Sequence, residues 1–159
     1  MRYRVFLSHS SKDNTWVKWI ADNARNSDID TYLFEYDVQP GTLMSDKIKK
    51  EIQSCNALVV LLTYNSQSSP YVHQEIGYAD GLHKRIIPLV QPDIQKGTLA
   101  MLEGKEYIPF DFSNPMQALT TLLNHLNQLK LSKEKEQDKK ILWGIGALIV
   151  LALIATSQK

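Results

Sequence analysis

Tyr71 and Glu75 are the two side chains of this sequence whose types and spacing are best suited to chemistry. They are four positions apart, which is about one turn of an α-helix, so on a helix both would project from the same face. A carboxylate held there could stabilise positive charge on a bound molecule, and the aromatic ring could stack against it. The ordinary alternatives are a solvent-exposed helix residue for Glu75 and a packing role for Tyr71.

Other chemistries are excluded by what the sequence lacks. A phosphate-accepting receiver needs an acidic pair after its first strand and an aspartate after its third, but these positions read Ser8-His9-Ser10 and Thr63-Tyr64-Asn65. Neither glycine-rich nucleotide motif, G-x-x-x-x-G-K-[ST] or G-x-G-x-x-G, is present. The single Cys55 cannot form an internal disulfide, and we predict no metal site and no cofactor. A formal net charge of +1 gives no strong attraction to nucleic acid, so none is expected as a partner.

Short apolar runs alternate with longer amphipathic stretches, which favours βαβ units and a parallel sheet. The expected strands span residues 4–8, 31–36, 57–62, 85–90 and 106–110. The expected helices span residues 13–25, 45–54 and 71–82, followed by a long helix that begins at Pro115. The predicted fold class is α/β, a flavodoxin-like doubly wound five-stranded parallel sheet plus a C-terminal apolar helix. Such sheets bind ligands beyond the carboxyl ends of their strands, at the switch point, so the loops after strands one to three should carry the site.

The C-terminal part of the chain divides into a charged connector at 132–140 and an apolar segment at 141–157. Fifteen residues from Ile141 to Ala155 carry no charge. They make about 22 Å of helix, near the lower limit for a membrane span once flanking residues are added. Five lysines between residues 130 and 140 lie just before this segment and one follows it, which by the positive-inside rule places the main domain in the cytoplasm. We therefore expect a cytoplasmic domain anchored to the inner membrane by one transmembrane helix. The alternative is a core or oligomer-interface helix.

Three segments, in the right order and spacing, resemble the TIR (Toll/interleukin-1 receptor) domain family and in particular its bacterial NAD-cleaving branch. Residues 5–13 (VFLSHSSKD) look like the family's first strand and the loop after it, and residues 36–41 (YDVQPG) match the D-x-x-P-G of its second-strand loop. Residues 69–77 (SPYVHQEIG) resemble the segment in which many TIR enzymes carry a tryptophan and, four residues later, the catalytic glutamate. The resemblance covers roughly residues 3–130 and implies a TIR domain at 1–131.

This resemblance implies cleavage of the nicotinamide–ribose bond of NAD⁺, which would be the substrate and not a cofactor. Glu75 would be the catalytic residue, because an oxocarbenium-like ribose needs a carboxylate beside it. The residues expected to bind NAD⁺ are Ser8, His9, Ser10, Ser11, Tyr36 and Tyr71. Tyr71 replaces the usual tryptophan, and Ser10 and Ser11 stand where some relatives place basic residues. Hydroxyls and backbone N–H groups can also hold a pyrophosphate. The alternative for His9 is a polar loop residue without a ligand.

The resemblance also implies assembly. The loop Asp37–Gly41, whose alternative role is a simple turn, is expected to pack against a second copy in a homo-oligomer or filament. The leading hypothesis is an NAD⁺ nucleosidase of anti-phage or immune-type signalling, acting either as a hydrolase or as a cyclase whose cyclic ADP-ribose a downstream effector senses. The alternative is a non-catalytic TIR adaptor or scaffold acting at the membrane, and Glu75 favours the enzyme because an adaptor needs no carboxylate there. A membrane-permeabilising effector is disfavoured because the apolar segment has no polar pore-lining residues.

Overall fold

A five-stranded parallel sheet forms the centre of the computed structural model, which describes residues 2–34, 46–94, 102 and 104–157, with side chains as far as residue 143. The strands are β1 (Tyr3–Ser8), β2 (Ile29–Leu33), β3 (Ala57–Leu62), β4 (Arg85–Val90) and β5 (Ile108–Pro109). Their order in the sheet is β2-β1-β3-β4-β5, and all neighbouring pairs are parallel. This is the flavodoxin-like order, in which the chain changes direction across the sheet between β1 and β3. The predicted α/β class with five parallel strands is confirmed.

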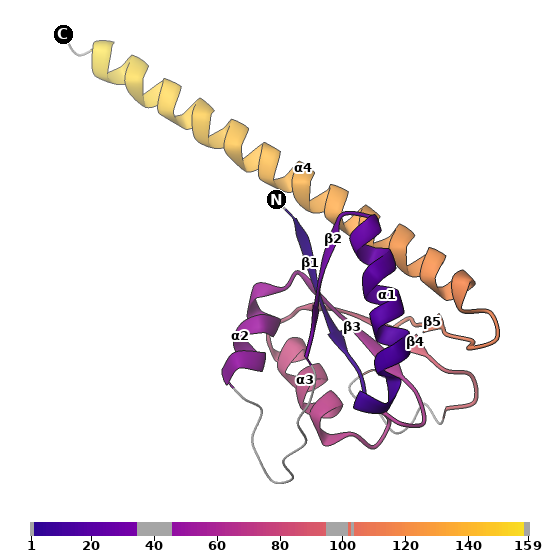
Figure 1. Cartoon of the computed structure of the whole chain (residues 1–159). Helices are drawn as coiled ribbons and strands as arrows, with labels where there is room; N and C mark the ends of the chain where they lie inside the picture. Colours follow the sequence, from indigo (N-terminus) through magenta and orange to yellow (C-terminus); the bar gives the residue numbers. More distant parts are fainter. Residues whose placement is uncertain (1, 35–45, 95–101, 103, 158–159) are drawn as a thin grey trace.

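Helices cover both faces of this sheet (Figure 1). The helical elements are a short 3₁₀ turn η1 (Ser11–Asp13), α1 (Asn14–Asn26), α2 (Asp46–Ser54), α3 (Pro70–Gly81) and α4 (Pro115–Ser157). Helix α1 and the first part of α4 lie on one face, and α2 and α3 lie on the other. Helix α3 begins where its sequence requires it to begin, because the Ser69 side chain caps the Val72 amide and Pro70 occupies the first turn.

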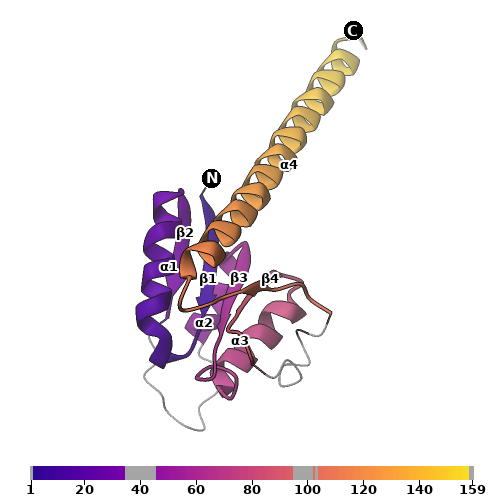
Figure 2. The same ribbon diagram turned by 90° about the vertical axis from the view of Figure 1, so that its right-hand side faces the viewer.

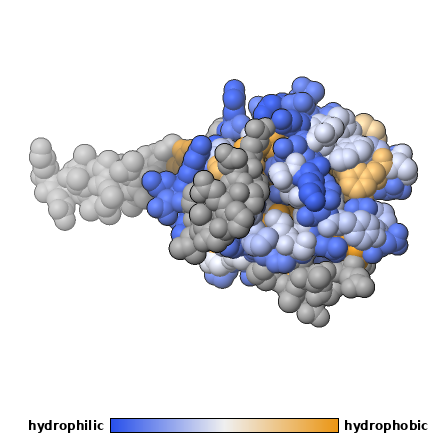
Figure 3. Space-filling view, turned by 60° about the horizontal axis from the view of Figure 1, so that its bottom comes forward, coloured by the Kyte–Doolittle hydropathy of each residue, from blue (hydrophilic) through white to orange (hydrophobic). Residues whose placement is uncertain are grey.

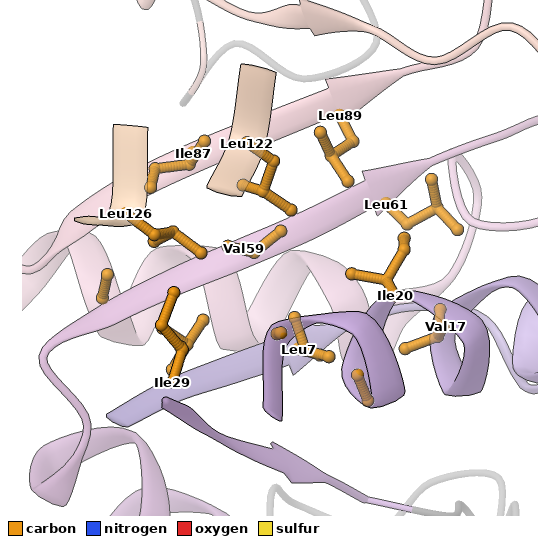
Figure 4. Packing of buried hydrophobic residues seen from close by; sticks show 14 of the residues in the cluster. Leu7, Val17, Ile20, Ile29, Val59, Leu61, Ile87, Leu89, Leu122 and Leu126 are labelled. Carbon is orange, nitrogen blue, oxygen red and sulfur yellow. The ribbon is translucent and has the colours of Figure 1, made fainter. Parts of the chain in front are cut away.

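Side chains that alternate along β1 build two apolar cores, one on each face of the sheet. Val5 and Leu7 point toward α1 and α4, whereas Phe6 between them packs into the cluster under α2 and α3. Figure 4 shows the first core, where residues of α1 and α4 meet those of the strands. Every residue of β3 is buried, as expected for a central strand that is covered on both faces.

The predicted strand boundaries agree with the structure at the centre of the sheet and differ at its edges. β3 and β4 span the predicted residues. β2 begins at Ile29 instead of residue 31, because Asp28 takes a positive φ of 57° that turns the chain out of α1, and Ile29 then pairs with Tyr3. β5 is reduced to two residues, since Pro109 has no N–H with which to extend a ladder.

Helix α4 runs without interruption for 43 residues. Its first part packs on the sheet through Ala118, Leu119, Leu122 and Leu126, all buried. The helix then continues past the edge of the sheet (Figures 1 and 2) and takes the charged residues 132–140 with it. Beyond them Ile141, Leu142 and Trp143 are exposed.

The predicted membrane anchor at 141–157, and the inner-membrane location derived from it, are wrong on this structure. Within the described residues, no helix combines the length and the apolar character that a bilayer crossing requires. The physical reason is visible in the sequence, because the uncharged run of about 22 Å falls short of a hydrocarbon layer of about 30 Å and joins directly onto the charged stretch before it.

Candidate active site

Glu75 occupies a core-facing position of α3. The buried residues of this helix are Val72, Glu75, Ile76 and Ala79, which follow the i, i+3, i+4, i+7 spacing of a single helix face. The Glu75 residue is 1% exposed. A solvated surface role for Glu75 is therefore wrong, and a carboxyl group stands where the pattern of the helix calls for an apolar side chain.

Ser8 at the end of β1 is the hydrogen-bond partner of this carboxyl group. The side chains of β1 alternate between faces, so Ser8 lies on the same face as Phe6 and is the next residue beyond the apolar core under α3. The Ser8 hydroxyl donates to Glu75 Oε2 over 2.5 Å, joining residues 67 positions apart. Ser8 also pairs with Val60 of β3, so the contact between β1 and α3 involves one of the two strands that flank the switch point.

Burial governs the electrostatics of Glu75. Desolvation raises the pKa of the Glu75 carboxyl to about 8, and the hydrogen bond from Ser8 opposes that rise only in part. The second carboxyl oxygen, Oε1, is buried and has no hydrogen-bond partner. In the described part of the chain no cationic side chain pairs with Glu75. A positive charge brought next to Oε1 would stabilise the carboxylate and lower its pKa.

Asp13 joins the loops that follow β1 and β3. Its Oδ2 accepts from the Thr63 hydroxyl over 2.6 Å, and its Oδ1 accepts from the Asn65 side-chain amide over 2.7 Å. Asp13 is 3% exposed, so the two donors compensate for the burial of its charge. The sequence-based site did not include these three residues. The available signal was an aspartate after strand one together with polar side chains after strand three.

The other predicted residues of the loop after β1 lie at different depths. His9 is buried, with Nδ1 3.0 Å from the Leu7 carbonyl oxygen and Nε2 2.8 Å from Asn14 Oδ1. Because a carbonyl oxygen only accepts, Nδ1 must carry a proton. Ser10 is half-buried and its hydroxyl caps η1 by accepting from the Lys12 amide, whereas Ser11 is exposed. The structure thus brings Ser8 to Glu75 and uses both His9 nitrogens within the chain itself.

Of the two aromatic residues predicted to bind NAD⁺, the structure describes Tyr71 but not Tyr36. Tyr71 is half-buried and lies one turn before Glu75 in α3. Tyr36 lies outside the described residues, as does the predicted assembly loop Asp37–Gly41. Their roles remain predictions.

Figure 3 faces the end of the molecule at which the parallel strands finish. The described surface there is mostly hydrophilic, with a few separate apolar spots. No cluster of metal-binding side chains is formed by the described residues. A hollow of about 810 Å³ lies near the start of β4 and beside β5, lined by residues such as Arg85, Tyr107 and His125, and neither Ser8 nor Glu75 lines it.

Comparison with known proteins identifies the fold and the family model that fits it. The model described as TIR domain matches residues 5–123. The TIR domains in the structure of the activated Roq1 resistosome recognising the effector XopQ are 16% identical, with a TM-score of 0.61 over 78% of this chain and 99% of that one. The TIR domain of the Toll-related receptor TRR-2 from Hydra magnipapillata is 16% identical, with a TM-score of 0.54 over 76% of this chain and 97% of that one.

A third similar structure is named as an enzyme. The Clostridium botulinum CMP N-glycosidase BcmB is 19% identical, with a TM-score of 0.53 over 75% of this chain and 96% of that one. At these identities the three structures show a shared fold. No match was found among curated protein sequences.

Proposed function

The chain belongs to the TIR domain family, and from that premise we propose that it is an NAD⁺ nucleosidase in which Glu75 is the catalytic residue. The observation that carries the proposal is the state of this carboxyl group. It is buried, has one oxygen without a partner, and pairs with no cation among the described residues. The nicotinamide of NAD⁺ carries a fixed positive charge and would act as the missing counter-ion.

The chemistry of the bond fits a single carboxylate. When the bond between the ribose C1′ and the nicotinamide nitrogen breaks, the electron pair goes to the nitrogen and nicotinamide leaves neutral, so no general acid is needed. The positive charge moves to the ribose, where Glu75 Oε1 would stabilise it. Water then adds to C1′ and releases a proton, giving ADP-ribose. Attack by a ring nitrogen of the adenine would instead give a cyclic product.

The surrounding residues take supporting roles in this proposal. The loop from His9 to Ser11 and the half-buried Tyr71 would line the bound NAD⁺. Tyr36, which lies outside the described residues, keeps its predicted role as a further NAD⁺-binding residue. One protein of the same fold is named as a CMP N-glycosidase. That name supports the idea that this sheet can carry the cleavage of an N-glycosidic bond.

The decisive experiment is incubation of the protein with NAD⁺, followed by separation of nicotinamide, ADP-ribose and cyclic ADP-ribose. We expect nicotinamide release by the wild type, and a loss of about 10²–10³ in rate for Glu75→Gln. CMP serves as the comparison substrate, because its neutral base needs protonation to leave. Release of cytosine but not nicotinamide would contradict the assignment of substrate. Absence of any release at high protein concentration would favour the non-catalytic adaptor.

A further inference from the structure

We propose that Ser8 is a positioning residue that fixes the orientation and protonation of the Glu75 carboxyl group, and does not itself bind NAD⁺. The proposal rests on the proposed function for its consequence in turnover. Its central measurement, the titration of Glu75, needs no turnover at all.

The geometry of the carboxyl group gives the first argument. The final torsion of a glutamate side chain is broad, so a carboxyl group without partners samples many orientations. Here Oε2 accepts the Ser8 hydroxyl over 2.5 Å, and both residues are 1% exposed. Oε1 has no partner. The hydrogen bond therefore decides which of the two carboxyl oxygens remains without a partner.

The rigidity of Ser8 gives the second argument. It belongs to a strand that is paired on both sides, to β2 through Leu7 and to β3 through its own register with Val60. A group on a paired central strand is held more accurately than one on a loop. The Asp13–Thr63 hydrogen bond joins the loops that follow β1 and β3, the two strands that pair at Ser8. Ser8 can thus hold the carboxyl group of a separate helix in a fixed place.

The use of the hydroxyl gives the third argument. A serine has a single O–H to donate, and at Ser8 that proton is committed to Glu75. This role differs from the ligand contact that the sequence predicted for Ser8. Donation to the carboxylate favours its charged form, so loss of the hydroxyl should raise the pKa of Glu75 further.

The test compares wild type, Ser8→Ala and Ser8→Thr by ¹³C NMR titration of carboxyl-labelled glutamate. The Glu75 resonance is assigned as the one missing from Glu75→Gln. We expect Ser8→Ala to raise the Glu75 pKa and Ser8→Thr, which keeps the hydroxyl, to restore it. Ser66→Ala is the matched control, because the buried Ser66 hydroxyl donates to the Leu61 carbonyl oxygen and accepts from the Thr63 amide, and Glu75 is not among its partners. It should leave the Glu75 titration unchanged.

Kinetics give the second readout. Ser8→Ala should lower kcat about 10–100-fold with KM within twofold, because misplacement of a catalytic group can cost about 10² in rate. An unchanged Glu75 titration in Ser8→Ala overturns the proposal, as does a raised KM at constant kcat, which would mean ligand binding by Ser8. If the wild type released no nicotinamide, the proposed function would fail. The titration would still decide whether Ser8 controls Glu75.

Discussion

Asp13 Oδ2 accepts a hydrogen bond from the Thr63 hydroxyl over 2.6 Å, across 50 positions of the chain. The two residues belong to the segments that follow β1 and β3, which are neighbours in the sheet. The contact therefore joins these segments beyond the carboxyl ends of the two strands, at the switch point. The carboxylate of Asp13 is buried among polar donors, unlike that of Glu75, which has only one. The same region thus contains one fully partnered acid and one acid with a free oxygen.

Asp13→Ala should destabilise the fold. The substitution leaves the buried Thr63 hydroxyl and the Asn65 amide without their acceptor, and each such loss costs about 1–3 kcal/mol. We expect the free energy of unfolding in urea to fall by about 2–4 kcal/mol. Asp22→Ala is the control, since Asp22 forms an exposed ion pair with Arg25, and such pairs contribute about 0–1 kcal/mol. Equal stability of the two variants would contradict the role of Asp13.

Glu75→Gln should stabilise the fold above mildly acidic pH. The pKa of about 8 in the folded protein lies above the ordinary glutamate pKa of 4.5, so the folded protein holds the proton more tightly than the unfolded chain. The wild type therefore loses stability as pH rises from about 4.5 to about 8, and the loss levels off above that range. Each pKa unit corresponds to about 1.4 kcal/mol, so the advantage of the neutral glutamine should reach a few kcal/mol at pH 9.

Urea unfolding of both proteins between pH 4 and pH 9 measures this difference. Two parallel stability curves would show that Glu75 titrates alike in the folded and unfolded states.

The pH dependence of turnover should report the titration of the Glu75 carboxyl group. If the carboxylate is the active form, kcat/KM for NAD⁺ should rise with pH through about 8, since this ratio reports the free enzyme. The profile of kcat reports the complex, in which the nicotinamide cation favours the carboxylate, so its acidic limb should lie at lower pH. Initial rates of nicotinamide release from pH 5.5 to 9 provide both curves. A rate that falls with rising pH would identify Glu75 as an acid instead.

Activity should depend on assembly through the predicted loop Asp37–Gly41. If a second copy completes the site, nicotinamide release per molecule should rise with protein concentration. Pro40→Ala combined with Gly41→Ala changes the two residues that restrict and permit the loop backbone, and should flatten that rise. Rates strictly proportional to concentration in both proteins would mean that a monomer is fully active.

The domain should fold without its C-terminal extension. Among the side chains of α4 that the structure describes, Leu126 is the last buried one. Lys130 binds Asp28 over 2.6 Å, whereas Leu131 is 55% exposed. Ending the chain at residue 131 should therefore change the free energy of unfolding by no more than about 0.5 kcal/mol. Ending it at Thr121 removes Leu122 and Leu126 and should prevent folding. Circular dichroism and urea titration distinguish the two cases.

The sequence was most informative where one local pattern decided the structure. The apolar run predicted β3 with its observed bounds, and α3 begins at Pro70, one residue before its predicted start. The alternation of strands and helices predicted the parallel sheet. The start of β2 depended on the positive φ of Asp28, which no apolar pattern encodes. The Ser8–Glu75 contact depended on two elements 67 positions apart meeting across the sheet. A glutamate at a core position of α3 was the one local sign of it.

Helix α4 extends far beyond the sheet as one continuous helix. From residue 132 to its end at Ser157 the helix adds about 40 Å, and whatever its far end contacts is held at a set distance and rotation from the sheet. Inserting one residue within 132–140 would turn the far end by about 100° and shift it by about 1.5 Å, whereas seven inserted residues would restore the facing direction to within about 20°. The number of residues in the charged stretch 132–140 therefore sets the rotation, about the axis of α4, of the C-terminal segment relative to the domain.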